Sequence, residues 1–148
     1  MALETGLFAR GLTLLMSLFH GLRRRNSAKL WTGNWEAYTL RGRYLSEPMR
    51  GAGPATVSLA RWTFSGKLQF ACYDCDAQGT PTRYQAGHIM LDPNDPEAAT
   101  RIGRYLDSAE VYEQRVRMLD KDTLLVIPVP ERSTLGNVYA THGWRRKR

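Results

Sequence analysis

Apolar and polar residues alternate along most of the chain with the two-residue period of a β-strand. The alternation predicts eight short strands, at residues 31–40, 56–64, 67–73, 83–91, 100–106, 111–119, 123–129 and 137–142. Turn residues separate them, such as Ser65-Gly66 and Asp120-Lys121-Asp122. Residues 41–54 and 92–96 are predicted loops, with at most one helical turn over 96–99. Short strands with no long helix among them favour an all-β fold, an antiparallel up-and-down barrel of about eight strands.

The first predicted strand carries a glycine two residues before a tryptophan. Gly33 allows the backbone to bend or to approach a neighbour closely, and Trp35 provides a large ring that can fill one end of a barrel. In the hairpin formed by 56–64 and 67–73, one face carries Leu68, Phe70 and Cys72. We assign that face to the interior.

Residues 5–22 show a helical period instead, with a narrow polar wedge and an apolar face that covers about half of the circumference or more. The interior Arg10 leaves this segment short of the ~20 nearly uncharged residues of a membrane-spanning helix. We expect the helix to lie in a membrane surface, with a basic flank that meets anionic headgroups. The membrane-contacting residues would be Phe8, Leu12, Leu15, Phe19, Arg23, Arg24 and Arg25. A helix that caps the barrel or mediates dimerisation explains the same apolar face equally well.

The net charge of +7 comes from 21 Lys and Arg against 14 Asp and Glu, and much of the excess lies near the two ends. The chain thus divides into a helix with its basic flank at 1–28, a barrel domain at 29–143 and a basic tail at 144–148. Basic ends favour anionic partners such as lipid headgroups, nucleic acid or a phosphorylated ligand. Solubility alone is the other explanation.

Catalytic and metal-binding patterns are weak in this sequence. Cys72-x-x-Cys75 is followed by His88, but a fourth ligand at zinc spacing is missing, and two thiols make no secreted disulfide framework. The sequence contains no Gly-x-Ser-x-Gly elbow and no glycine-rich phosphate loop. We therefore expect a binding protein in a reducing compartment, with no catalytic residues, no metal and no cofactor.

Arginines next to aromatic residues recur along the predicted strands. Alternation places each arginine and its neighbour on opposite faces of the sheet, so one member of each pair faces the lumen. Arginines in the lumen or at its mouth would form an anion pocket, because guanidinium groups match phosphates bidentately. Outward-facing arginines would instead limit pairing between sheet edges. The candidate ligand-binding residues are Arg61, Trp62, Arg83, Tyr84, Arg104, Tyr105 and Arg117.

Three short motifs, Trp31-Thr32-Gly33-Asn34-Trp35, Gly87-His88 and Ile102-Gly103-Arg104-Tyr105, resemble the β-barrel effectors of bacterial cyclic-oligonucleotide antiphage defence. The resemblance implies a barrel at the cytoplasmic face of the inner membrane that binds a cyclic dinucleotide, oligomerises and disrupts the membrane. For such a ligand we expect some of Arg61, Arg83, Arg104 and Arg117 to meet the phosphates and Tyr84, Trp62 or Tyr105 to stack on a base. The family usually has two transmembrane helices, whereas this chain has room for one short amphipathic helix.

The Gly-x-Trp start also resembles the lipocalins, whose barrels carry small apolar ligands. That resemblance implies an arginine late in the chain packed over Trp35, with Arg145 and Arg117 as candidates. Lipocalins usually have a signal peptide, whereas Glu4, Arg10 and the three arginines at 23–25 lead us to expect that residues 1–25 are not one. Our leading hypothesis is a non-enzymatic sensor of a cyclic nucleotide. A lipocalin-like carrier and a nucleic-acid-binding protein that uses residues 145–148 are the alternatives.

Overall fold

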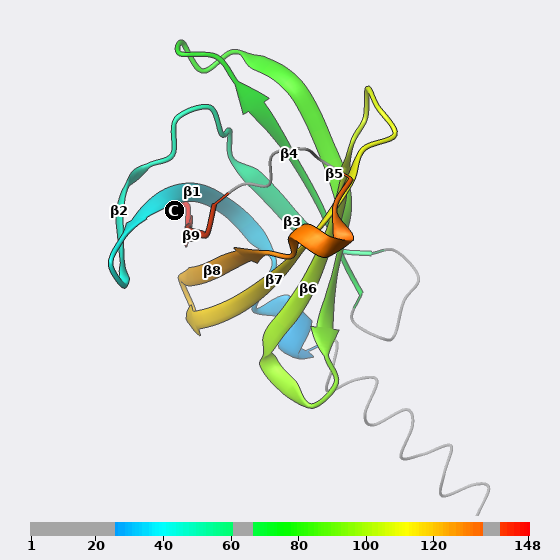
Figure 1. The fold of residues 1–148 in the computed structure, drawn as a ribbon. Helices are drawn as coiled ribbons and strands as arrows, with labels where there is room; N and C mark the ends of the chain where they lie inside the picture. Colours follow the sequence, from blue (N-terminus) through cyan, green and yellow to red (C-terminus); the bar gives the residue numbers. More distant parts are fainter. Residues whose placement is uncertain (1–25, 61–66, 135–139) are drawn as a thin grey trace, which may run out of the picture.

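The structure is a computed structural model, and it describes residues 26–60, 67–134 and 140–148. Within these ranges the chain forms a closed eight-stranded antiparallel β-barrel with one additional strand (Figure 1). The strands are β1 (Gly33–Arg41), β2 (Tyr44–Pro48), β3 (Ala55–Leu59), β4 (Leu68–Cys75), β5 (Pro81–Asp92), β6 (Asp95–Tyr105), β7 (Val111–Asp120), β8 (Thr123–Pro128) and β9 (His142–Arg146). A short 3₁₀ helix, η1 (Pro130–Arg132), follows β8. Strands β3 to β9 pair in chain order, and β1 closes the barrel by pairing with both β3 and β9.

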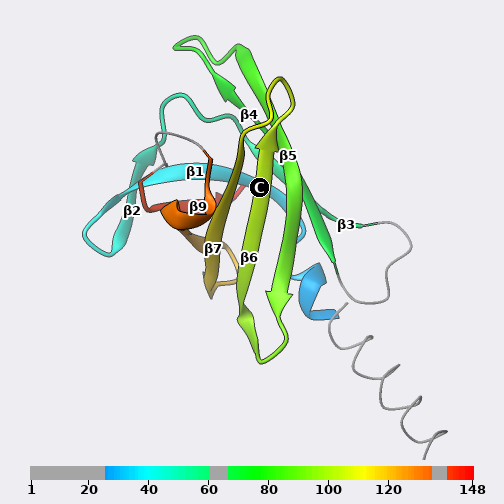
Figure 2. The same cartoon turned by 45° about the vertical axis from the view of Figure 1, so that its right-hand side comes forward.

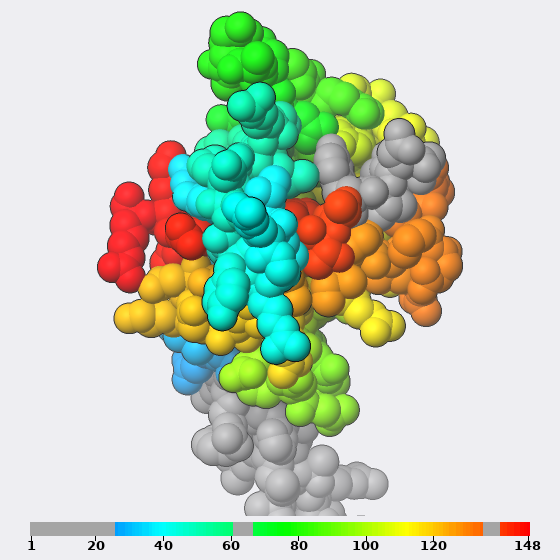
Figure 3. Space-filling model, turned by 60° about the vertical axis from the view of Figure 1, so that its left-hand side comes forward, coloured from blue at the N-terminus to red at the C-terminus, as the bar shows by residue number. Residues whose placement is uncertain are grey.

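β2 is the additional strand, and it lies within residues 41–54. The prediction that this whole segment is a loop is therefore wrong in part. It pairs with the end of β1 through Leu40↔Leu45 and Arg41↔Tyr44. Figure 3 shows β2 lying across the outside of β9, where Leu45 packs against Gly143. Most residues of β2 are exposed. A strand at a sheet edge buries no complete face, so its sequence carries no alternation to reveal it.

Two other predicted boundaries differ from the structure. The predicted loop at 92–96 is too long, because Pro93 and Asn94 alone form the turn and β6 begins at Asp95. Residues 96–99, where at most one helical turn was expected, belong to β6. The predicted last strand at 137–142 is displaced, since β9 covers His142–Arg146 and residues 135–139 lie outside the described ranges. Part of the predicted basic tail at 144–148 is therefore a strand of the barrel.

The predicted inner face of the hairpin is confirmed. β3 and β4 pair through Leu59↔Leu68 and Val57↔Phe70. Leu68 and Phe70 are buried and belong to the core, and Cys72 packs against it. Gly87 and Gly103 pair with each other across β5 and β6.

One end of the barrel is closed by two tryptophans. Trp31 and Trp35 are almost completely buried, and the Trp35 indole N–H donates to the Trp31 carbonyl at 3.0 Å. Gly33 has a φ of +132°, and a Cβ there would lie 2.8 Å from Nη1 of Arg146. The predictions made from the Gly-x-Trp pattern are confirmed: Gly33 permits a close approach and Trp35 fills one end.

The arginine that packs over Trp35 is Arg146. Its guanidinium lies 4.3 Å from the Trp35 ring centroid. The candidates drawn from the lipocalin resemblance are wrong in this respect, because Arg145 stacks instead on Tyr38 and Arg117 pairs with acidic residues on the outer surface. Arg146 occupies the position because alternation in β9 turns it inward together with Trp144 and His142.

The predicted N-terminal helix at 5–22 and its membrane contacts lie outside the described residues. A helical turn at residues 26–29 leads into β1. In the ranges that the structure describes, no helix has the length and apolarity needed to cross a membrane.

Candidate functional site

The barrel interior has an apolar half and a polar half. Alternation turns every second residue of each strand inward, and along β4 the inward residues change from Leu68 and Phe70 to Cys72 and Asp74. The same change runs across the neighbouring strands. The polar half contains Cys72, Asp74, Gln85, Arg101, Tyr105, Tyr112, Gln114 and His142. The sheet thus gathers many hydrogen-bonding groups at the end opposite Trp31 and Trp35.

Arg101 of β6 lies at the centre of this polar half and is 4% exposed. Its Nη1 donates to Oε1 of Gln114 at 2.7 Å, and its Nη2 donates to the Tyr112 hydroxyl at 3.1 Å and to Sγ of Cys72 at 3.4 Å. Its Nε is buried and has no hydrogen-bond partner in the described part of the chain. Arg101 also forms no ion pair with any described carboxylate. The barrel therefore holds a buried cation with an unused donor.

Aromatic rings surround the Arg101 guanidinium in place of a counterion. Its central carbon lies 4.1 Å from the ring centroid of Phe70, 4.6 Å from that of Trp144 and 5.4 Å from that of Tyr112. Such cation–π contacts stabilise a desolvated cation by about 2 kcal/mol or more. Gly103 makes the arrangement possible, because a Cβ there would lie 2.8 Å from the Phe70 ring.

A chain of hydrogen bonds connects Arg101 to the rim of the barrel. The Tyr112 hydroxyl donates to Oε1 of Gln85, and Nε2 of Gln85 donates to Oδ1 of Asp74 at 2.6 Å. The Tyr105 hydroxyl donates to the other oxygen of Asp74 at 2.9 Å. Both carboxylate oxygens of Asp74 are therefore engaged by donors from the barrel wall. This lowers the repulsion that Asp74 would exert on an anion near Arg101.

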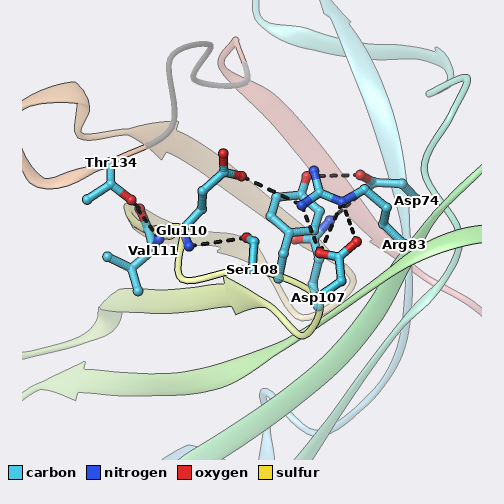
Figure 4. Close-up of polar contacts among 9 residues, drawn as sticks. Asp74, Arg83, Asp107, Ser108, Glu110, Val111 and Thr134 are labelled. Atoms are coloured by element: carbon cyan, nitrogen blue, oxygen red, sulfur yellow. Dashed lines mark hydrogen bonds and ion pairs between the residues drawn. The ribbon is translucent and has the colours of Figure 1, made fainter.

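Arg83 covers the rim at the end of this chain (Figure 4). Its guanidinium lies 3.7 Å from the Tyr105 ring centroid and donates three hydrogen bonds to the two carboxylate oxygens of Asp107, of which the shortest, from Nη2 to Oδ1, is 2.9 Å. Glu110 lies 3.6 Å away. The hydrogen bond from Arg83 lowers the pKa of Asp107 below its ordinary value. Acidic partners thus occupy the donors of Arg83.

A cavity of about 50 Å³ adjoins Arg101, with Cys72 and His142 in its wall. Met49, Ala52 and Gly53 also line it, and the segment 49–53 is tied to β4 by backbone hydrogen bonds from Gly53 to Tyr73 and from Cys75 to Gly51. The cavity is well below the 300–1,000 Å³ of sites for drug-sized ligands. It can hold a few waters or a group the size of a small oxyanion.

Burial keeps two titratable groups of the cavity wall neutral near pH 7. It raises the pKa of the Cys72 thiol, and nearby Arg101 only partly opposes that effect. Burial also lowers the pKa of His142, whose Nδ1 lies 2.9 Å from the Ala140 carbonyl oxygen. The formal positive charge in the wall therefore comes from Arg101.

The predicted ligand-binding residues do not form one site. Arg83 and Tyr105 meet at the rim, whereas Tyr84 and Arg104 are exposed on the outer face of the barrel. Arg117 lies toward the other end of the barrel and pairs with Asp95 at 3.1 Å and Glu97 at 3.7 Å. Arg61 and Trp62 lie outside the described residues.

The weak zinc pattern is also split by the fold. Cys72 faces the interior, and His88 is exposed on the outer surface of β5. No group of three or more His, Cys, Asp and Glu side chains suited to a metal ion occurs among the residues described here.

Sequence reasoning missed Arg101, together with Gln85 and Gln114. All three are polar residues at buried inward positions, Gln85 in β5, Arg101 in β6 and Gln114 in β7. Arg101 is opposite Gln114 in the register of β6 and β7. Tyr105 and Arg101 are four positions apart in β6, so alternation turns both inward. Aligning the inward residues of β6 and β7 would then have brought Arg101 and Gln114 together.

Comparison with protein families and with curated proteins finds no match. Among solved structures, the chain is similar to a redesigned β-barrel, with a TM-score of 0.57 and 14% sequence identity. The similarity covers 82% of this chain and 96% of the designed one. At that identity the likeness shows the barrel fold and no more.

Proposed function

We propose that this protein is a non-enzymatic ligand-binding barrel whose polar half binds an oxyanion group through Arg101. The observation that carries the proposal is a buried guanidinium beside a cavity, with an unpartnered Nε and without a described carboxylate partner. Burying a charge without a counterion is costly, by several kcal/mol per ion even after relaxation. A ligand that brings a negative charge would offset this cost.

The shape and chemistry of the guanidinium favour an oxyanion. Its planar fork of N–H donors matches carboxylate and phosphate oxygens, and it stays charged at all physiological pH values. The neutral Cys72 and His142 side chains leave the charge of Arg101 available to the ligand. The aromatic rings around Arg101 fix its plane, which lowers the entropy lost on binding.

A cyclic dinucleotide remains the ligand that the resemblance to antiphage effectors favours. The present cavity holds no more than one of its anionic groups, so entry of the whole ligand requires residues 49–53 to move away from β4. Membrane attachment, oligomerisation and a place at the inner membrane belong to the same hypothesis. They rest on the N-terminal sequence pattern and on that resemblance.

Isothermal titration calorimetry with inorganic phosphate, a panel of cyclic dinucleotides and a fatty acid tests the proposal. We expect heat with phosphate or with a cyclic dinucleotide, and a loss of at least tenfold in affinity in Arg101→Gln. Arg117→Gln is the matched control, because Arg117 lies on the outer surface among acidic partners. Absence of binding by the full chain to every oxyanion tested, or equal binding by Arg101→Gln, would refute the proposal.

A lipocalin-like carrier is the second candidate, and the stacking of Arg146 over Trp35 favours it. Heat with the fatty acid alone, unchanged in Arg101→Gln, would support this alternative and refute the oxyanion proposal. The predicted nucleic-acid binder needs free cations in the C-terminal segment. In the described residues Arg146 is bound to carbonyls, Lys147 lies 3.7 Å from Glu36, and Arg148 pairs with Asp122 at 2.8 Å. Affinity that falls steeply with salt would support that alternative.

A further inference from the structure

The outer face of the barrel carries a second concave feature, far larger than the interior cavity. A groove of about 490 Å³ runs over β3, β4, β5, β6 and the start of β7. Figure 2 shows β5, β6 and β7 side by side on this part of the barrel. The volume lies within the range of sites for small organic ligands.

The strand register explains how a barrel exterior becomes hollow here. Thr56, Ala71, Ala86 and Arg104 are consecutive cross-strand partners and form one row across the sheet. The adjacent row, one pleat away, is Ser58, Gln69, His88 and Ile102. The first row is low at Ala71 and Ala86, whose side chains are methyl groups. Longer side chains on either side of these alanines enclose a flat floor.

Charge in the groove is positive and has no acidic partner. None of the residues that line it is Asp or Glu. Arg104 is exposed at the end of the low row, and no ion pair or hydrogen bond joins its side chain to another residue in the described ranges. The nearest acid in the register, Glu113, lies opposite Ile102 and pairs with Arg132 at 3.6 Å. Arg104 is thus available for an anionic group.

Apolar side chains complete the wall next to Arg104. Ile102 is 38% exposed and Val111 is 39% exposed, and Val111 is the cross-strand partner of Arg104 in β7. Tyr84 is also exposed on this face, and the register places it diagonal to Arg104 across β5 and β6. Diagonal neighbours on one face are within reach of aromatic and long side chains.

We propose that this groove is a binding site for a small organic anion with a flat, apolar body. The body would lie on Ala71 and Ala86, with Ile102 and Val111 as its apolar wall, and the anionic group would bind Arg104. The site is separate from the interior cavity, since Arg104 and Arg101 point to opposite faces of β6. The inference therefore does not depend on the proposed function of Arg101.

The fluorescence of 8-anilinonaphthalene-1-sulfonate, an aromatic anion of suitable size, tests this site. We expect saturable enhancement with the folded full chain and at least fivefold weaker binding in Arg104→Gln and in Ala86→Leu, which fills the floor. Ala71→Leu fills the same floor from β4 and gives a second test where Ala86→Leu lowers stability. Arg115→Gln is the matched control, because Arg115 is exposed on β7 and does not line the groove.

Thermal unfolding and circular dichroism of each variant show that the barrel is intact. No saturable binding by the parent chain would overturn the proposal, and so would unchanged binding in Arg104→Gln and both leucine variants. Loss of dye binding in Arg101→Gln, with Arg104→Gln unaffected, would place the dye inside the barrel and also overturn it. A failure here leaves the calorimetric test of Arg101 unchanged, because the two experiments use different residues and probes.

Discussion

The two ends of the barrel interior each hold an arginine on aromatic rings, but the two side chains have very different partners. Arg146 donates to the carbonyls of Leu30, Thr32 and Lys121 at 2.6–3.1 Å and lies 3.4 Å from Asp122. Arg101 has neutral partners, an unpartnered Nε and an adjacent cavity. An inward arginine can thus either tie chain segments together or present its charge to a ligand.

The largest effect is expected at the end that Arg146 closes. Arg146→Met would leave three backbone carbonyls without their donor and release the N-terminal segment from the β7–β8 turn. We expect the free energy of unfolding to fall by about 2–4 kcal/mol, measured by urea denaturation. Arg145→Met is the control, because Arg145 is exposed and should cost under about 1 kcal/mol. Equal losses of unfolding free energy in both variants would show that Arg146 does not hold the N-terminal segment against the β7–β8 turn.

A substitution at Gly33 should also destabilise the end of the barrel that Trp31 and Trp35 close. A side chain at this position meets both an unfavourable φ of +132° and a Cβ position 2.8 Å from Nη1 of Arg146. We expect Gly33→Ala to lower the free energy of unfolding by about 1–3 kcal/mol. In Arg146→Met the steric part is removed, so the cost of Gly33→Ala should shrink in a double-mutant cycle. Strict additivity would mean that backbone strain alone explains the loss.

How far the sequence predicts these two ends depends on the kind of residue that faces inward. The closed end was predictable, because a glycine in a strand indicates a close approach of the backbone to a neighbour, and a nearby tryptophan indicates a large ring that fills the interior. Gly33 and Trp35 have these two roles. Arg101 was not, because charged residues are almost never fully buried unless paired, so its inward phase gave no reason to count it as interior. For the same reason Arg146, one of several basic residues at the C-terminus, was not predicted to face the interior. The partners that make an inward charge tolerable come from other strands.

Replacing Arg101 tests whether the arginine of the polar end is less important for stability than Arg146. Arg101→Met should keep the fold and change the free energy of unfolding by less than Arg146→Met does, because the lost hydrogen bonds are offset by removal of a buried charge. Oxyanion binding should fall by at least tenfold, which is about 1.4 kcal/mol. Urea denaturation and calorimetry on the same samples measure both effects. A loss of stability as large as that of Arg146→Met would assign Arg101 a purely structural role.

The smallest expected effect comes from His142, which packs at the polar end and not at the closed one. Burial lowers its pKa in the folded state below the ordinary value of 6.5, so the unfolded chain binds the proton more readily. Stability is therefore complete above pH 6.5 and is lost as the pH falls through that value. Between pH 7 and pH 6 one such group contributes up to about 0.7 kcal/mol.

Urea denaturation at the two pH values, with His142→Asn alongside, measures this contribution. The variant should lose most of the difference between pH 7 and pH 6, whereas His88→Asn should keep it, because His88 is exposed on the outer face. The carboxylates whose pKa is lowered, Asp95 and Asp107, titrate at more acidic pH and do not interfere in this range.

A bound oxyanion would oppose the effect of pH, since its negative charge stabilises the protonated form of His142 as well as the charge of Arg101. The same titration repeated with saturating sulfate, which keeps its charge between pH 6 and pH 7, should therefore show a weaker pH dependence, and an unchanged one would separate His142 from the ligand site.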